Sequence, residues 1–161
     1  MDIPLQLNEY FFPHVEVMAD PTAGERESDK TSNNFTVKVG STKVDQNNDV
    51  YQVTLEILSK PEIEGSKQNY TIKLIAIGFF SVDSEKEDVE KLLRVSGASI
   101  LYASAREFLI TITARGPWGP VMLPIASFLE IYEENNKNKT AVKRKPRKTK
   151  QKVKQEEDLT P

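Results

Sequence analysis

The stretch that decides the fold runs from Ile100 to Phe128 and reads ILYASAREFLITITARGPWGPVMLPIASF. Its first part is rich in apolar residues and predicts a helix from about Ser99 to Ala114. Gly116 and Pro117 predict the helix end, because glycine can adopt the positive φ of a C-terminal cap and proline cannot continue the helical hydrogen bonds. The segment from Gly116 to Pro124 then combines three prolines and two glycines with large apolar side chains. We expect an irregular loop that covers or binds something apolar.

The expected helix is apolar over more of its circumference than one buried stripe requires. Its apolar residues are Ile100, Leu101, Ala103, Ala105, Phe108, Leu109 and Ile112. Side chains spread this widely cannot all face one core. The small residues at positions 103–105 would let a second helix approach closely, so the pattern favours an oligomer.

Four segments upstream show the alternation of β-strands. Their expected ranges are Tyr10–Met18, Phe35–Val44, Val50–Ser59 and Tyr70–Val82. Pro13 predicts that the first strand lies at an edge or starts irregularly. The turn-forming residues Gln46–Asp49 predict a hairpin between the second and third strands. The fourth strand becomes apolar on both faces, which predicts a place inside the assembly.

Two further helical pieces are expected around the long helix. Ser84 stands three residues before Glu87 and predicts a capping box that opens a short helix. The residues Val95–Ala98 predict a break between this piece and the long helix. A last amphipathic helix is expected from about Ile125 to Asn135, with apolar side chains on one side and glutamates on the other.

Charge divides the chain into two parts. The formal net charge is −2, but residues 137–161 carry ten Lys/Arg and three Asp/Glu, whereas residues 1–136 carry twelve basic and twenty-one acidic residues. We therefore expect a domain over 1–136 and a disordered basic tail over 137–161. Two interpretations of the tail stay open: an arm that binds nucleic acid or an acidic partner, and a solubilising tail that folds back on the acidic domain.

Composition argues against cofactor chemistry and catalysis. The chain has no cysteine and one histidine, His14, so thiolate metal sites are excluded and an imidazole site on one chain is disfavoured. His14 beside Glu9 or Glu16 is better interpreted as a surface or interface histidine than as part of an acid–base pair. For Arg106–Glu107 we favour ion contacts at an interface over a catalytic dyad. We expect no enzyme and no cofactor.

The compartment expected from the sequence is the cytoplasm. The first residues, MDIPLQLNEYFF, show no basic segment followed by an apolar one, as a secretory signal would. No stretch approaches the roughly 20 uninterrupted apolar residues of a membrane span, so we expect no membrane insertion.

The order of these features resembles the SecB family of protein-export chaperones. The residues that carry the resemblance are Ile100-Leu101-Tyr102, Ala105-Arg106-Glu107, Arg115-Gly116, Pro120 and Leu123-Pro124, followed by Phe128 and Tyr132. The resemblance implies an α+β fold with a four-stranded antiparallel sheet and two main C-terminal helices. It also implies a homotetramer, built as a dimer of dimers joined through the longer helix.

The function that the resemblance implies is an ATP-independent holdase. Such a chaperone binds unfolded or secretion-bound polypeptides in apolar grooves and delivers them to the SecA motor. The groove residues carried over to this chain are Trp118, Val121, Met122, Leu123, Phe128 and Tyr132. The residues carried over to the interface between dimers are Tyr102, Arg106 and Phe108.

This chain departs from the family pattern where the motor would dock. Typical members have an acidic outer face on the first and fourth strands, whereas this chain has His14, Met18 and Lys73 there. The basic tail is a second departure. Two alternatives to general export therefore stay open: a dedicated SecB-like chaperone of a single partner such as an antitoxin, and a nucleic-acid-associated adaptor that acts through the tail.

Overall fold

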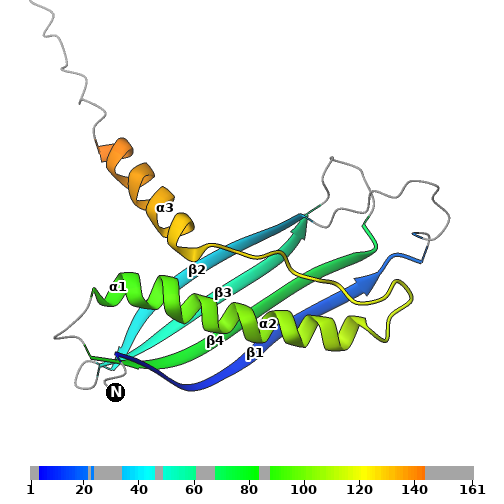
Figure 1. The fold of residues 1–161 in the computed structure, drawn as a ribbon, viewed down its shortest axis with the longest axis horizontal. Helices are drawn as coiled ribbons and strands as arrows, with labels where there is room; N and C mark the ends of the chain where they lie inside the picture. Colours follow the sequence, from blue (N-terminus) through cyan, green and yellow to red (C-terminus); the bar gives the residue numbers. More distant parts are fainter. Residues whose placement is uncertain are drawn as a thin grey trace, which may run out of the picture.

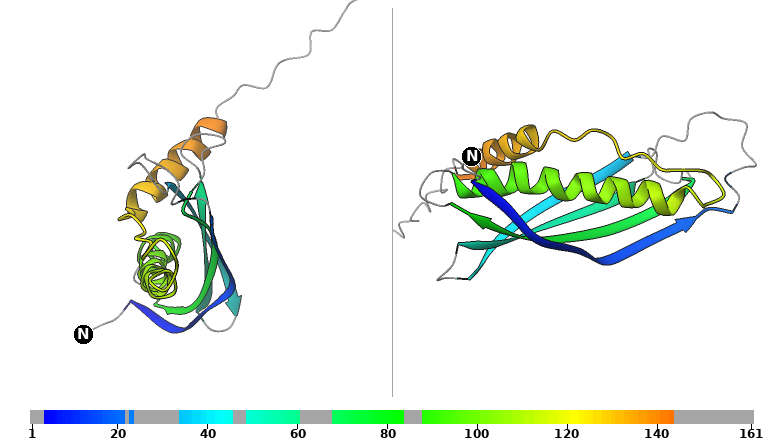
Figure 2. Two further views of the ribbon diagram at one scale, coloured as in Figure 1. Left: turned by 90° about the vertical axis from the view of Figure 1, so that its right-hand side faces the viewer. Right: turned by 60° about the horizontal axis from the view of Figure 1, so that its bottom comes forward.

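The structure, a computed structural model, is a β-sheet with a long helix lying along one face. It describes residues 4–21, 23, 34–45, 49–60, 68–83 and 88–143. Figure 1 shows the four strands side by side under the helix, and Figure 2 shows that this helix covers one face of the sheet. The α+β fold class is confirmed.

The sheet is antiparallel throughout, with the strand order β1-β4-β3-β2. The strands are β1 (Leu5–Ala19), β2 (Asn34–Asp45), β3 (Val50–Lys60) and β4 (Tyr70–Val82). Strands β2 and β3 pair as the expected hairpin, although turn residues 46–48 lie outside the described residues. Strand β4 lies between β1 and β3, in agreement with its apolar residues on both faces.

Strand β1 is an edge strand with an irregular register, as Pro13 predicted. Its pairing with β4 passes from Phe11 opposite Ile77 to His14 opposite Ile75, so the proline sits at a register shift. Proline has no N–H to donate to a ladder, and bulges and edges are the places in a sheet where it fits. The strand begins at Leu5, five positions before the expected start at Tyr10.

One face of the sheet and one stripe of the long helix form the core. Val53, Leu55, Ile57 and Leu74 have no exposed surface, because alternate residues of a strand share a face. From the helix, Leu101, Ala105 and Leu109 are also fully buried; they stand four residues apart and therefore lie on one stripe. Gly78 on β4 lets the helix come close to the sheet at Leu101.

The helical region from Val89 to Thr113 is continuous, and the expected break at Val95–Ala98 is wrong. Helix α1 (Val89–Leu92) passes through one π-helical turn, η2 (Leu93–Gly97), into α2 (Ala98–Thr113) (Figure 1). Gly97 keeps helical angles of φ −61° and ψ −45°, so the chain absorbs an irregular turn without leaving the helix. The expected capping residues Ser84 and Glu87 lie outside the described residues; Asp88 caps α1 by accepting the Lys91 N–H at 3.2 Å.

Helix α2 ends near the expected position, but Gly116 does not supply the left-handed residue. Among the described residues the only positive φ belongs to Gly119, at 75°. Gly116 is required for a different reason, because a Cβ there would overlap the hydroxyl of Tyr70. The glycine therefore permits a close approach between the end of α2 and the start of β4.

Helix α3 occupies Phe128–Lys143, which corrects the expected range of Ile125–Asn135 at both ends. Ile125 still belongs to the extended segment before the helix, and the Ser127 hydroxyl accepts the Glu130 N–H at 3.4 Å at the helix start. In the middle of α3, Glu133 and Lys137 have the i, i+4 spacing that supports a solvated helix. Residues 144–161 lie outside the described part, so the domain boundary and the disordered tail stay predictions. No described helix is long and apolar enough to cross a membrane.

Gly78→Ala is expected to lower the free energy of unfolding by about 1–3 kcal/mol, because overpacking a filled core costs that much. A Cβ at this position would lie 2.8 Å from Leu101 Cδ2 and 2.9 Å from Phe80 Cε2. Urea denaturation measures the change.

Gly40→Ala on β2 is the matched control, since a Cβ there would meet nothing within 4 Å. It should leave stability unchanged or raise it by about 0.4–1 kcal/mol. Equal losses in the two variants would contradict the close approach of α2 at Gly78.

Candidate functional site

The crossover segment, residues 114–127, runs from the end of α2 back along the helix to the start of α3 (Figure 1). Its first half is held by hydrogen bonds, and its second half alternates between buried and exposed side chains. The space between this segment and α2 is the candidate site.

The Tyr70 hydroxyl fixes the first half of the crossover segment. It accepts the Trp118 N–H at 3.1 Å and donates to the Gly119 carbonyl at 3.1 Å. The Trp118 indole Nε1–H donates to the Asp20 carbonyl at 2.9 Å. Thr113 adds a third attachment, because its Oγ1 accepts the Val121 N–H at 2.8 Å while donating to the Leu109 carbonyl at 2.6 Å. We call Tyr70, Thr113 and Trp118 the latch.

The side chains in the second half of the crossover segment alternate between buried and exposed from Val121 to Pro124, and the alternation ends at the exposed Ile125. Val121 and Leu123 are 5% and 1% exposed and pack into the core, whereas Met122 and Ile125 are 59% and 90% exposed. Val121 and Leu123 were expected to line a client groove. In this packing they instead anchor the segment, because in an extended chain every second side chain turns inward.

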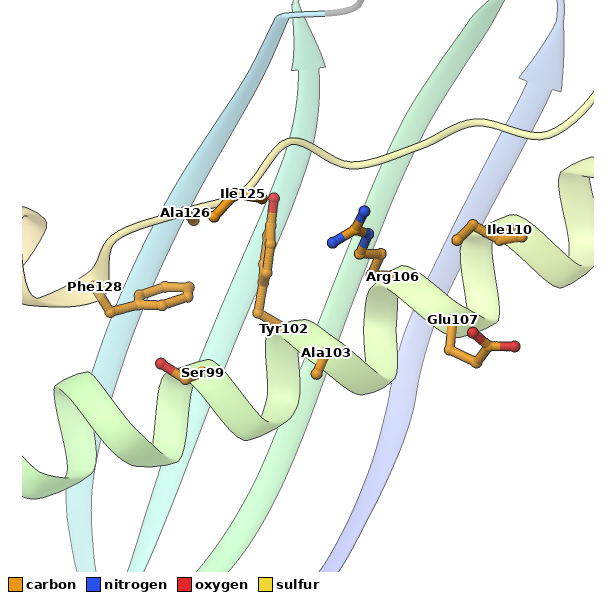
Figure 3. A pocket seen from close by; sticks show the side chains of 9 residues that line it. All are labelled: Ser99, Tyr102, Ala103, Arg106, Glu107, Ile110, Ile125, Ala126 and Phe128. Carbon is orange, nitrogen blue, oxygen red and sulfur yellow. The ribbon is translucent and has the colours of Figure 1, made fainter.

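A groove of about 440 Å³ lies between α2 and the crossover segment, within the size range of ligand sites. Figure 3 shows Tyr102 and Arg106 of α2 pointing toward the segment that carries Ile125 and Ala126, with Phe128 beside Tyr102. The groove is lined by Ser99, Tyr102, Ala103, Arg106, Glu107, Ile110, Ile125, Ala126 and Phe128. Its walls are therefore largely apolar, with Arg106 and Glu107 as its charged residues.

Tyr102 joins α2 to the far end of the crossover segment. The Tyr102 hydroxyl donates to the Pro124 carbonyl at 2.7 Å. The Tyr102 ring packs edge to face against Phe128, with ring centres 5.4 Å apart. Burial raises the pKa of the Tyr102 phenol, and the nearby charge of Arg106 opposes that shift in pKa. A buried phenol with a carbonyl acceptor is held neutral and donating.

The three residues expected at an oligomer interface occupy two sides of α2. Tyr102 and Arg106, four residues apart, face the crossover segment. Tyr102 is 6% exposed in its own chain, so it offers little surface to a partner, and its place at an interface between dimers stays a prediction. Phe108 stacks on Phe12 of β1, with ring centres 4.7 Å apart, and lines a second groove of about 520 Å³.

The exposed stripe of α2 lies between these two grooves. It consists of Ile100, Ala103, Glu107 and Thr111, with the half-exposed Ser104 beside them. Ser104 and Thr111 donate to helix carbonyls four residues back, at 3.2 and 3.0 Å. This stripe, with Phe108 at its side, is the helix surface left for a partner.

The structure brings His14, Met18 and Lys73 together on the face of the sheet opposite α2. In the register of β1 and β4, His14 lies opposite Ile75, and Lys73 lies opposite Glu16. His14 Nε2 and a Glu16 carboxylate oxygen are 3.5 Å apart. Apolar residues continue the same face, since Phe11 and Phe79 have ring centres 6.3 Å apart.

Sequence reasoning missed several residues of the site. Ile125 was expected in the last helix, and Ile110 was not expected at any site, but both residues line the groove. Tyr70 was expected only as a strand residue, since alternation reports which way a side chain points but not what its hydroxyl meets. The usable signal was the proline-rich composition of the segment, which predicted an irregular apolar loop at this place in the chain.

Tyr70→Phe is expected to lower the free energy of unfolding by about 1–3 kcal/mol, because the Trp118 N–H and the Gly119 carbonyl lose their partner. Trp118 is the only tryptophan of the chain, so intrinsic fluorescence reports on the latch directly. The emission should shift to longer wavelength as the indole becomes more hydrated.

Tyr10→Phe is the control, since Tyr10 is exposed and its hydroxyl makes no hydrogen bond within the described part of the chain. It should change neither stability nor emission. An unchanged emission in Tyr70→Phe would mean that the latch does not hold Trp118.

Alkaline pH is expected to destabilise the fold through Tyr102. Its pKa is raised in the folded state, so its contribution to stability is complete below the unfolded pKa of about 10 and is lost as pH rises through the folded value. Urea midpoints at pH 8 and pH 11 measure the effect. The urea midpoint of Tyr102→Phe should fall less between the two pH values than the midpoint of the parent chain. At pH 8 the free energy of unfolding of this variant should be about 1 kcal/mol lower than that of the parent, because the hydrogen bond to the Pro124 carbonyl is lost. A drop as large as the parent's would rule out Tyr102 as the source.

Comparison with known proteins places this architecture in one family. The family model described as "Preprotein translocase subunit SecB" matches residues 14–139. The protein-export protein SecB of Nitrobacter winogradskyi is 28% identical over 114 residues, which are 70% of each chain. The protein-export protein SecB of Bradyrhizobium diazoefficiens is 25% identical over 122 residues, 75% of this chain and 74% of that protein. The match to the Ehrlichia canis protein is 29% identical and spans 57% of this chain and 56% of that one.

The fold has a counterpart among solved structures. A Mycobacterium tuberculosis SecB-like chaperone, solved in complex with a ChAD peptide from the HigA1 antitoxin, superposes with a TM-score of 0.57 at 14% identity. The superposition covers 77% of this chain and 91% of that one. Since the family model spans most of the sequence and the sheet and helices agree, the chain belongs to the SecB family of protein-export chaperones.

Proposed function

We propose that this chain is an ATP-independent holdase that binds unfolded or secretion-bound polypeptides along α2. The observation that carries the proposal is the apolar groove under the crossover segment, about 440 Å³ in volume, with Ile125 at its edge 90% exposed. The exposed Met122 and Leu129 lie near Ile125 in sequence, and contiguous exposed apolar surface beside a groove marks interaction sites on soluble proteins. Membership of the SecB family supports a polypeptide as the ligand.

Such a groove would bind many sequences for a simple physical reason. Each large apolar side chain that leaves water contributes roughly 1.5–3 kcal/mol, and that contribution does not depend on a particular hydrogen-bond pattern. Met122, 59% exposed on the same segment, adds a flexible side chain that adapts to different shapes. Folded proteins offer no extended apolar segment, so the groove would select by folding state.

The division of labour within the predicted groove residues follows from their placement. We assign client contact to Met122 and Tyr132, with Ile125 added, and assign the wall of the groove to Phe128, which is 3% exposed. We assign Trp118, Val121 and Leu123 to holding the segment in place. The exposed Leu129 would continue the apolar path onto α3. The ChAD peptide bound to the SecB-like chaperone of the same fold supports a polypeptide as the occupant.

Assembly and delivery complete the proposal. We assign the exposed stripe of α2, with the adjoining Phe108, to contacts within a homotetramer, because the stripe leaves the apolar Ile100 and the small Ala103 exposed. Clients would pass to SecA in the cytoplasm, and the protein would act without catalysis. The face with His14, Met18 and Lys73 differs from the acidic docking face of typical members, so docking there would use apolar contacts around Phe11 and Phe79.

Ile125→Ser is expected to weaken client holding with little effect on folding, because the side chain is 90% exposed. Losing one buried isoleucine should raise the Kd for an unfolded client about tenfold or more. Light scattering of a denatured client, diluted into increasing chaperone concentrations, measures this.

Val44→Ser is the matched control: Val44 is 54% exposed on β2, away from the groove. This variant should suppress aggregation of the client to the same extent as the parent chain does. If the parent chain at a stoichiometric ratio leaves aggregation unchanged, the holdase proposal is wrong.

A further inference from the structure

The groove contains a cation, Arg106, that forms no ion pair with any described residue. Arg106 lines the groove and is half-exposed. The ion pairs between described residues use His14, Lys38, Lys43 and Arg94, and none of them involves Arg106. Its guanidinium also makes no hydrogen bond within the described part of the chain. The group is therefore available to a ligand.

Arg106 is directed into the groove. Figure 3 shows Arg106 and Tyr102 extending from α2 toward the crossover segment, whereas the neighbouring Glu107 points away from that segment. The charge of Arg106 acts on the phenol of Tyr102, in agreement with this orientation. Glu107 also lines the groove, but it forms no ion pair with Arg106 within the described part of the chain.

An apolar client alone would be a poor match for this charge. Covering Arg106 with Ile, Leu or Phe side chains would take the guanidinium out of water with nothing to compensate it. A carboxylate is the group that a guanidinium binds best, through two parallel hydrogen bonds. Ile110, Ile125 and Phe128 around it would reduce the access of water and strengthen such a pair.

We propose that the groove favours unfolded segments in which a single Asp or Glu is flanked by large apolar residues, with Arg106 binding the carboxylate. This inference rests on the proposed holdase function and specifies its client. The acid has to be isolated, because residues 1–136 carry twenty-one acidic against twelve basic residues and would repel strongly acidic segments.

The position of Arg106 requires an internal carboxylate. From Ser99 to Ile110 the helix rises about 16 Å, the length of about five residues of extended chain. Arg106 lies between these two ends, so apolar client residues would occupy the groove on both sides of the acid. A side-chain carboxylate fits this arrangement, and the C-terminus of a chain does not.

Two labelled nine-residue peptides test the inference, both apolar and capped at each end, with Glu or Gln at the centre. Fluorescence anisotropy with the full chain should give a Kd about three- to fivefold lower for the Glu peptide at low salt, the scale of a partly exposed ion pair. The difference should shrink as salt screens the charges. Arg106→Gln should remove it, and Arg106→Lys should restore part of it.

Arg115→Gln is the control, since Arg115 is exposed beyond the end of α2 and does not line the groove. It should keep the preference for Glu. Circular dichroism and sedimentation check that each variant keeps its fold and its mass.

Four results would overturn the inference. Equal binding of the two peptides would remove the carboxylate preference and leave the holdase proposal intact. Binding of neither peptide would remove both. A Gln peptide with a free C-terminal carboxylate that binds as tightly as the Glu peptide would contradict the internal position. A change of assembly mass in Arg106→Gln would mean that Arg106 pairs with a second copy of the chain.

Discussion

The burial of one stripe of α2 against one face of the sheet is the constraint on which the other features depend. Leu101, Ala105 and Leu109 lose all their exposed surface there, and Gly78 makes room for the closest contact. Once this stripe is fixed, the rotation of the helix is fixed too. Tyr102 and Arg106 must then face the crossover segment, and Ile100, Ala103 and Glu107 must face outward.

The crossover segment is attached to the core and still keeps some of its large apolar side chains exposed. A segment with large apolar side chains would collapse onto the core if nothing limited it. The hydrogen bonds of the latch hold the first half, because Tyr70 and Thr113 bind backbone groups of the segment. The buried Val121 and Leu123 fix the path of the second half. Met122 stays exposed because it lies between the inward-facing Val121 and Leu123. The alternation ends at Pro124, and Ile125 after it is exposed as well.

The sequence predicts the sheet and the long helix through local periodicity, and it predicts the loop through its prolines and glycines. Alternation along β3 places Val53, Leu55 and Ile57 on one face, and all three are buried. The sequence does not reveal which side of α2 meets the sheet, since its apolar residues surround the helix, and so Tyr102 was expected at an interface. The π turn before Gly97 and the hydroxyl of Tyr70 were also missed, because both depend on packing between distant segments.

The hydroxyls on the exposed stripe of α2 change what it costs to dehydrate that surface. Ser104 and Thr111 each donate to a carbonyl of their own helix, so neither needs a hydrogen-bond acceptor from water or from a partner. A surface that contains serine and threonine would ordinarily lose solvation on contact and require compensating bonds. Here the donors are already used, and a partner with no polar groups in matching positions can cover the stripe without leaving an O–H group unsatisfied.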